Sequence, residues 1–224
     1  MDQPTQALHP PPTLPRQDRL RTAETSLADF AQIFTLAGVG HPLNEALNAL
    51  CRLIERWMPG ALCSILLLED GRRLRHGGNV SLPLEYIQSI DGTEIGLETG
   101  SCGAAAFQKR RIVVSDIETH PYWAAYRHLA LRFGLAACWS TPLLQDDGSV
   151  PGTFAVYYRE KREPIAAELA LIDQVAAATR LLLELHRTET ELRQSQRMLQ
   201  ALLDNIPICI FWKDRESRYL GANR

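Results

Sequence analysis

The cysteines are the first residues of this 224-residue chain whose chemistry needs an account. Five are present, widely spaced and in mostly apolar surroundings: Cys51, Cys63, Cys102, Cys138 and Cys209. The odd number and the spacing favour reduced thiols over a disulfide framework. Cys102 differs from the others because a short helix is expected to begin beside it, and a helix N-terminus lowers the pKa of a nearby thiol. Cys102 is therefore a candidate sensor thiol.

A second group of candidate residues is aromatic and polar. Trp123, Tyr126 and Arg127 lie in residues 118–134, a segment that we call the lid. Aromatic walls with one cation and a few hydroxyls would suit a small planar or anionic ligand. The alternative, that the aromatic side chains simply belong to the hydrophobic core, stays open.

The strand expected after the lid adds further candidates. Alternation along a strand places Cys138 and Ser140 on one face and Trp139 and Thr141 on the other. The first pair would then line a cavity together, whereas the second pair would act in packing.

Motifs of the common enzyme classes are absent from the sequence. It contains no Walker-type glycine loop, no GxGxxG after a strand, and no HExxH or CxxC metal pair. A metal site built from His120, His128 and Cys138 is an alternative, but isolated histidines are more often solvated or hydrogen-bonded. His186 lacks the neighbours typical of a phosphoacceptor. We assign no catalytic and no metal-binding residue, and any cofactor is unknown.

The candidate residues need a sheet to hold them, and one hairpin is predicted with little ambiguity. Residues 136–144 and 153–158 are apolar, β-branched or aromatic, and residues 146–149 supply turn chemistry between them. Few polar residues interrupt either arm. Both faces of the hairpin, residues 135–160, should therefore be covered, which indicates a central position in the sheet.

Other elements follow from helical spacing, β-branched runs and glycine or proline stops. We expect helices at residues 16–38, 42–58, 83–90 and 122–133, a short one from residue 104, and strands at 61–68, 72–76 and 111–117.

Residues 164–203 contain no internal glycine or proline after Pro164 and carry a heptad pattern. One seam position holds Leu171, Ala178, Leu185, Leu192 and Leu199, and the other holds Val175, Leu182, Glu189, Gln196 and Leu203. A helix with such a stripe would pair with another helix, parallel or antiparallel, and we expect a homodimer through the terminal helices. The alternative is a long single helix that packs on its own domain.

Bulk properties narrow the partners. A formal charge of −2 gives no basic field, which argues against nucleic acid. No apolar run approaches the roughly 20 residues of a membrane span, and the N-terminus has no secretory signal. We expect a cytoplasmic protein without a membrane span in this segment.

Four short motifs, in this order and spacing, resemble those of GAF domains. They are GSCGAA at 100–105, VVSDI at 113–117, STPL at 140–143 and GTFA at 152–155. The resemblance covers residues 23–185 and implies an α+β fold, an antiparallel sheet of about six strands flanked by helices. It also implies a pocket between the sheet and the lid, where an unknown small molecule would bind. The candidate ligand-binding residues are Cys102, Trp123, Tyr126, Arg127, Cys138, Ser140 and Tyr157.

A second resemblance, to the opening of a PAS domain, begins near the end of the long helix. Its motifs are LLDNIP at 202–207, IFWKD at 210–214 and RYLGAN at 218–223. A PAS fold needs roughly a hundred residues, so we infer a piece of a longer multidomain protein. The predicted organisation is a disordered proline-rich tail (1–15), a GAF domain (16–163), its C-terminal helix and coiled linker (164–203) and the truncated start of a PAS domain (204–224).

These resemblances imply a bacterial sensor module that signals through a dimeric helix to PAS and to an output domain, a histidine kinase or a cyclic-di-GMP enzyme. A ligand-free dimerisation scaffold is the alternative. Some GAF proteins resemble free methionine sulfoxide reductases, but residues 153–157 lack the acidic residues of those enzymes, and the lid holds no cysteine. An enzymatic role for this segment is therefore not expected, and a thiol redox sensor is a further alternative.

Overall fold

The computed structural model describes residues 28, 30–31, 33–35, 42–205 and 211–222. The predicted tail at 1–15 lies outside the described residues, and so does most of the predicted helix at 16–38, whose described positions are helical. The remaining elements are α2 (Leu43–Trp57), β1 (Leu62–Glu69), β2 (Arg73–Asn79), α3 (Leu84–Ile90), β3 (Thr93–Glu94), α4 (Gly100–Gln108), β4 (Ile112–Val114), the 3-10 turn η1 (Pro121–Trp123), α5 (Arg127–Arg132), β5 (Ala137–Pro142), β6 (Gly152–Tyr158), α6 (Ala166–Asp204), β7 (Phe211–Lys213) and β8 (Tyr219–Ala222).

Six strands form one antiparallel sheet in the order β3-β2-β1-β6-β5-β4. The predicted hairpin is the β5–β6 pair, in which Cys138 lies opposite Tyr157 and Ser140 opposite Ala155. Strand β6 also pairs with β1, so the hairpin is internal, and all of its β6 residues are buried. The predicted α+β fold and the central hairpin are confirmed.

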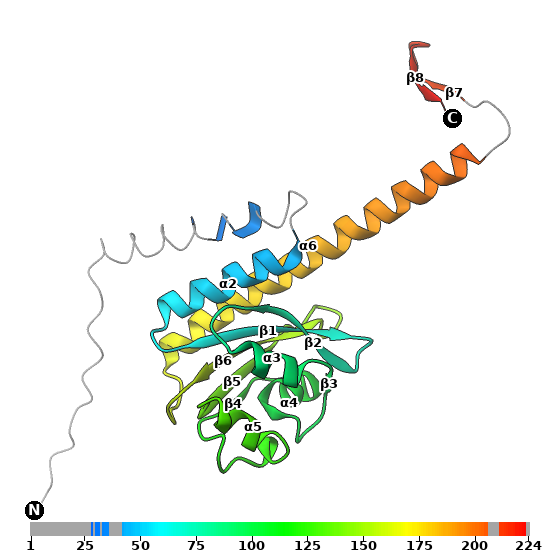
Figure 1. Cartoon of the computed structure of the whole chain (residues 1–224). Coiled ribbons are helices and arrows are strands. Elements are labelled where there is room, and N and C mark those ends of the chain that lie inside the picture. The colour runs from blue at the N-terminus through cyan, green and yellow to red at the C-terminus, as the bar shows by residue number, and fades with distance from the viewer. Residues whose placement is uncertain (1–27, 29, 32, 36–41, 206–210, 223–224) are drawn as a thin grey trace, which may run out of the picture.

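Helices cover both faces of this sheet, α2 and α6 on one side and α3, α4 and α5 on the other (Figure 1). Two hydrophobic cores result. Trp139 and Phe154 pack in the core beside α2 and α6, whereas Cys138 and Tyr157 pack in the opposite core beneath α3 and α4. The pleat therefore sorts alternate residues of one hairpin into two environments.

Strand β2 is longer than predicted, because the two glycines at its end continue the strand instead of stopping it. A Cβ atom on Gly78 would lie 2.7 Å from the Cβ atom of Leu47 in α2. The glycine thus lets the helix lie directly against the strand. In the sequence alone, a glycine that permits such a close approach cannot be distinguished from a glycine that ends a strand.

The lid is less regular than predicted. Strand β4 ends at Val114, since the carboxylate of Asp116 accepts hydrogen bonds from the Glu118 backbone N–H (3.0 Å) and the Thr119 hydroxyl (2.9 Å) and so forms a turn. The helix expected at 122–133 is divided into η1 and α5. Tyr126, with φ −112° and ψ 0°, precedes α5 and interrupts the helical run.

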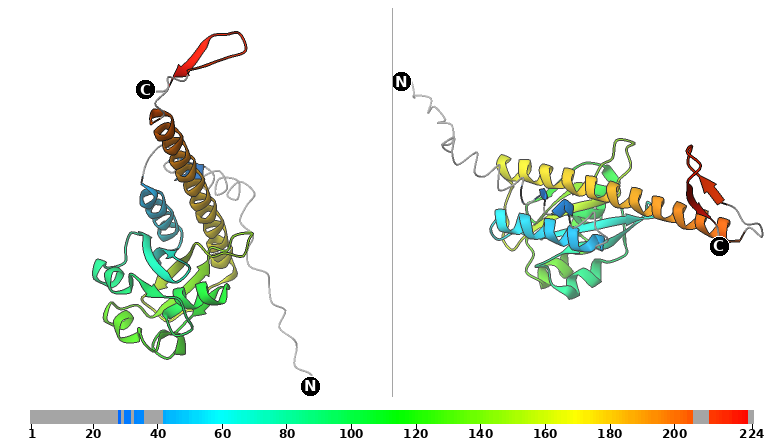
Figure 2. Two further views of the ribbon diagram at one scale, coloured as in Figure 1. Left: turned by 90° about the vertical axis from the view of Figure 1, so that its right-hand side faces the viewer. Right: turned by 90° about the horizontal axis from the view of Figure 1, so that it is seen from above.

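Helix α6 has two different halves. Its first turns are buried against the body through Ile172, Val175 and Leu182. The second half extends beyond the sheet (Figure 2), where Leu192 and Leu199 are 57% and 59% exposed. The first half of α6 therefore packs on its own domain as a single helix, whereas pairing of the second half with another helix stays a prediction.

Beyond α6, β7 and β8 form a two-stranded antiparallel hairpin whose side chains are mostly exposed. The assignment of this hairpin to the start of a PAS domain stays a prediction. Within the described part of the chain, no helix has the length and apolar character that crossing a membrane requires.

Candidate functional site: a cavity between the sheet and the lid

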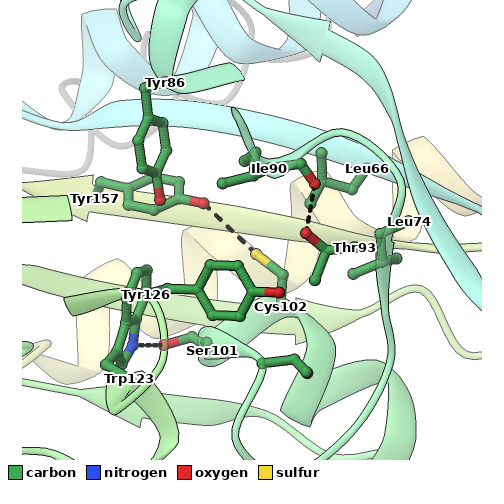
Figure 3. A pocket seen from close by; sticks show the side chains of 12 residues that line it. Leu66, Leu74, Tyr86, Ile90, Thr93, Ser101, Cys102, Trp123, Tyr126 and Tyr157 are labelled. Atoms are coloured by element: carbon green, nitrogen blue, oxygen red, sulfur yellow. Dashed lines mark hydrogen bonds between the residues drawn. The ribbon is translucent and has the colours of Figure 1, made fainter. Parts of the chain in front are cut away.

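A small cavity of about 30 Å³ lies on the side of the sheet away from α2 and α6, between the sheet and the layer formed by α3, α4 and the lid (Figure 3). Its walls are mainly aromatic and aliphatic, with a few hydroxyls and one thiol. The lining residues are Leu66, Leu74, Tyr86, Ile90, Thr93, Thr99, Gly100, Ser101, Cys102, Trp123, Tyr126 and Tyr157. Among the described residues, none that lines the cavity carries a charge.

The start of α4 brings the lid and the sheet together. Gly100 has φ +71°, a conformation that glycine adopts without strain, and a Cβ atom there would lie 3.6 Å from the Trp123 ring, an ordinary van der Waals contact. The indole Nε1–H of Trp123 donates to the Ser101 hydroxyl (3.0 Å), which in turn donates to the backbone carbonyl of Cys138 (3.1 Å). This buried chain of hydrogen bonds links the lid, α4 and β5.

The Cys102 thiol lies on the cavity wall, 7% exposed and 3.6 Å from the Tyr157 hydroxyl. Its pKa is lowered to about 7, chiefly by a hydrogen bond with the Cys138 thiol, while burial acts in the opposite direction. The hydroxyls of Tyr157, Ser140 and Thr153 lower this pKa further. Cys102 is thus set apart from an ordinary buried thiol.

The other titratable groups around the cavity are held in their neutral forms. Burial is the largest cause of the raised pKa values of Cys138, Tyr157 and Tyr86. The rings of Tyr86 and Tyr157 meet edge to face at 5.9 Å. The site is therefore a mainly aromatic chamber in which, among the described residues, the Cys102 thiol is the one acidic group of the lining.

Four of the seven residues predicted to bind ligand line the cavity: Cys102, Trp123, Tyr126 and Tyr157. Cys138 and Ser140 lie on the predicted face of β5 but are fully buried behind the lining. Arg127 does not line the cavity, and its guanidinium donates to the backbone carbonyl of His120 (3.4 Å). Ligand binding by any of these residues stays a prediction.

Sequence reasoning missed the far side of the cavity, which β1, β2 and α3 supply. Tyr86 and Ile90 have helical spacing on the buried face of α3, and Leu66 follows the alternation of β1. These signals indicated buried positions, but no local pattern shows that they share a wall with α4.

The histidines of the lid have structural surroundings. His120 Nδ1 accepts a hydrogen bond from the Tyr122 backbone N–H (3.2 Å), and burial lowers the pKa of its ring. His128 is exposed. Over the described residues, no cluster of three or more His, Cys, Asp and Glu side chains is arranged to hold a metal ion.

The fold and the cavity define a GAF domain, and comparison with protein families agrees. The GAF domain family model matches residues 40–184, so the chain belongs to this family. This confirms the GAF resemblance for the body of the chain, whereas the PAS assignment of the C-terminal hairpin is not tested by it.

One curated relative is the methyl sulfide methyltransferase-associated sensor of Methanosarcina acetivorans, 30% identical over 206 residues. The match covers 91% of this chain but only 21% of that protein, so the chain spans about a fifth of the length of its relative. The chain is therefore a GAF domain homologous to a segment of a sensor protein.

Two solved structures share the fold. A domain of a two-component sensor histidine kinase protein from Sinorhizobium meliloti superposes with a TM-score of 0.58 at 19% identity, covering 69% of this chain and 99% of that one. The free methionine-R-sulfoxide reductase of Neisseria meningitidis superposes with a TM-score of 0.57 at 17% identity, covering 82% and 98%. At these identities the likeness concerns the fold alone.

Proposed function

We propose that the chain is the input segment of a longer cytoplasmic signalling protein, in which the GAF domain binds a small uncharged ligand and passes the change along α6. Helix α6 carries this proposal. One continuous helix packs on the domain through Val175 and Leu182 and then presents exposed Leu192 and Leu199 beyond it. An apolar stripe of this kind is covered when two such helices pair, which supports a dimer.

The cavity supports a ligand without charge. A buried ion would need a partner of opposite charge, and among the described residues the lining offers only rings, aliphatic groups, hydroxyls and a thiol. Arg127 was expected to favour an anion, but it does not line the cavity. A neutral, mostly apolar molecule with one hydrogen-bonding group is the class that these walls favour.

The lid provides the mechanical step. Trp123 and Tyr126 close one side of the cavity, and the hydrogen bonds through Ser101 reach β5. A ligand larger than the present cavity would displace the lid and bias two packings of lid and sheet. Helix α6 lies on the other face of the same sheet, where Trp139 of β5 packs in its core. We propose that α6 transmits the shift to a PAS domain and to a histidine kinase or cyclic-di-GMP output.

Native mass spectrometry of the purified chain tests this proposal, because it reports a retained ligand and the oligomeric state together. We expect a dimer with a noncovalent adduct that Tyr126→Ala removes and Tyr122→Ala, a lid tyrosine outside the lining, retains. Hydrogen exchange before and after removal of the adduct should then differ in residues 118–134 and in α6. No difference in either segment would contradict the signalling proposal.

A ligand-free dimerisation scaffold is favoured by one observation, the volume of the cavity. About 30 Å³ accommodates one or two water molecules and no ring-sized ligand. The scaffold would be supported if the dimer carries no adduct and if the mass of Tyr126→Ala differs from that of the unsubstituted chain only by the substitution.

A further inference from the structure

Two thiols from different elements lie on the same side of the sheet. Cys102 lies in α4 and Cys138 in β5, and both are buried in the core beneath α3 and α4. Two contacts join the start of α4 to the hairpin at this point. Ser101, the neighbour of Cys102, donates to the Cys138 carbonyl at 3.1 Å, and Tyr157, which lies opposite Cys138 in the sheet, places its hydroxyl 3.6 Å from the Cys102 sulfur.

Two buried hydroxyls beside these thiols have no hydrogen-bond partner among the described residues. Ser140 and Thr153 are fully buried, and alternation places them on the same face of the hairpin as Cys138 and Tyr157. A buried hydroxyl without a partner costs roughly 1–3 kcal/mol. An anion on the Cys102 sulfur would give both hydroxyls an acceptor, and the uncharged lining leaves hydroxyls and the Cys138 thiol to stabilise it.

We propose that Cys102 and Cys138 form a dithiol that hydrogen peroxide oxidises, with Cys102 as the attacking sulfur and Cys138 as the resolving one. Access assigns these roles, since Cys102 lines the cavity whereas Cys138 is fully buried behind it. The cavity of about 30 Å³ admits a molecule of the size of water or hydrogen peroxide. A bulky hydroperoxide would first have to displace the lid, so hydrogen peroxide should react faster.

The reaction balances with hydrogen peroxide as the sole oxidant. The Cys102 thiolate attacks one peroxide oxygen, an S–O bond forms, the O–O bond breaks, and hydroxide leaves and takes up a proton to give water. Cys138 then loses its proton and attacks the Cys102 sulfur, so that an S–S bond forms, the S–O bond breaks, and the departing hydroxide becomes a second water. Two thiols and one peroxide yield one disulfide and two waters.

The first step also prepares the second. The negative charge of Cys102 contributes to the raised pKa of Cys138, and a neutral sulfenic acid removes this contribution. The resulting disulfide would join α4 to β5 beneath the lid, at the carbonyl that Ser101 already contacts. Oxidation therefore acts on the same hydrogen-bond chain that positions Trp123.

The test uses the full chain with Cys209→Ser, because Cys209 lies outside the described residues. Hydrogen peroxide should produce a species that lacks two hydrogen atoms, and peptide mapping should locate a Cys102–Cys138 bond. Cys51 and Cys63 are internal controls, since burial raises the pKa of both thiols in the opposite core. They should remain reduced until the chain is unfolded. Reaction with cumene hydroperoxide should be slower, because this molecule does not fit a cavity of about 30 Å³.

Substitutions separate the two roles. Cys138→Ala, or Cys138→Ser if alanine impairs folding, should accumulate a sulfenic acid at Cys102 that dimedone traps. Ser140→Ala should move the pH midpoint of the rate upward from about 7, whereas Ser64→Ala, another buried hydroxyl without a partner on that face, should leave it unchanged. The proposal is overturned if Cys102 reacts no faster than Cys51, or if the bulky hydroperoxide reacts as fast as hydrogen peroxide.

Discussion

The hydroxyl of Ser101 connects three elements of the candidate site, and its removal gives the sharpest test of the site's construction. It accepts from the Trp123 indole at 3.0 Å, donates to the Cys138 carbonyl at 3.1 Å, and is fully buried. Ser101→Ala would leave the indole N–H without a partner and remove one bond from the carbonyl. Leaving a buried donor unsatisfied costs roughly 1–3 kcal/mol, so we expect the free energy of unfolding to fall by about 2–3 kcal/mol.

Urea unfolding at pH 6, where the Cys102 thiol is mostly protonated, measures this loss without a contribution from ionisation. Hydrogen exchange adds the local effect. Because Trp123 loses its anchor on α4, amides of residues 118–134 should exchange faster, while amides in the core beside α2 and α6 should follow only the global loss of stability.

Ser140→Ala is the matched control, since it makes the same chemical change at another fully buried serine on β5. The Ser140 hydroxyl has no hydrogen-bond partner among the described residues, so its removal leaves no donor or acceptor unsatisfied and should not lower the free energy of unfolding. Equal losses for the two variants would refute the reasoning, because they would show that the loss comes from cavity formation and not from the hydrogen bonds through Ser101.

Three further predictions concern stability, pairing and packing. The pKa of Cys102 is lowered in the folded state, so the contribution of this thiol to stability should increase as pH rises from about 7 toward the unfolded value of 9. The pKa of Cys51 is raised, so the contribution of that thiol should decrease above about pH 9. The free energy of unfolding of each alanine variant, measured against pH, checks both slopes. Leu182→Ala removes a fully buried side chain and should cost about 2–5 kcal/mol, whereas Leu192→Ala, at a 57% exposed position, should weaken only self-association, as light scattering would show. Gly78→Ala places a methyl group 2.7 Å from a side chain of α2 and should cost about 1–3 kcal/mol in thermal or urea unfolding.

Much of the fold followed from local patterns. The apolar arms and the turn at residues 146–149 predicted the β5–β6 hairpin, and alternation correctly separated Cys138 from Trp139. The uninterrupted stretch after Pro164 predicted α6, which begins at Ala166 and ends at Asp204. Such features are local, because the period of a strand or helix is set by its own backbone.

Local patterns were wrong where another part of the chain overrode them. Gly78 was taken for the end of a strand, but packing against α2 requires a glycine within the strand. The lid helix was predicted as continuous, but the chain breaks it at Tyr126, three residues after Trp123 reaches across to Ser101. At Gly78 a contact distant in sequence outweighs the intrinsic preference of the segment.

By itself, the sequence determined the elements of this GAF domain, the two faces of its central hairpin and the individual residues capable of chemistry. Only the tertiary structure decided which of them meet. It set Arg127 apart from the cavity, added the wall of Tyr86 and Leu66, and joined the start of α4 to β5 through Ser101 and the Cys138 carbonyl. The physical reason is that alternation fixes the direction of a side chain within its own strand, whereas the separation between a helix and a sheet depends on the packing of all the side chains between them.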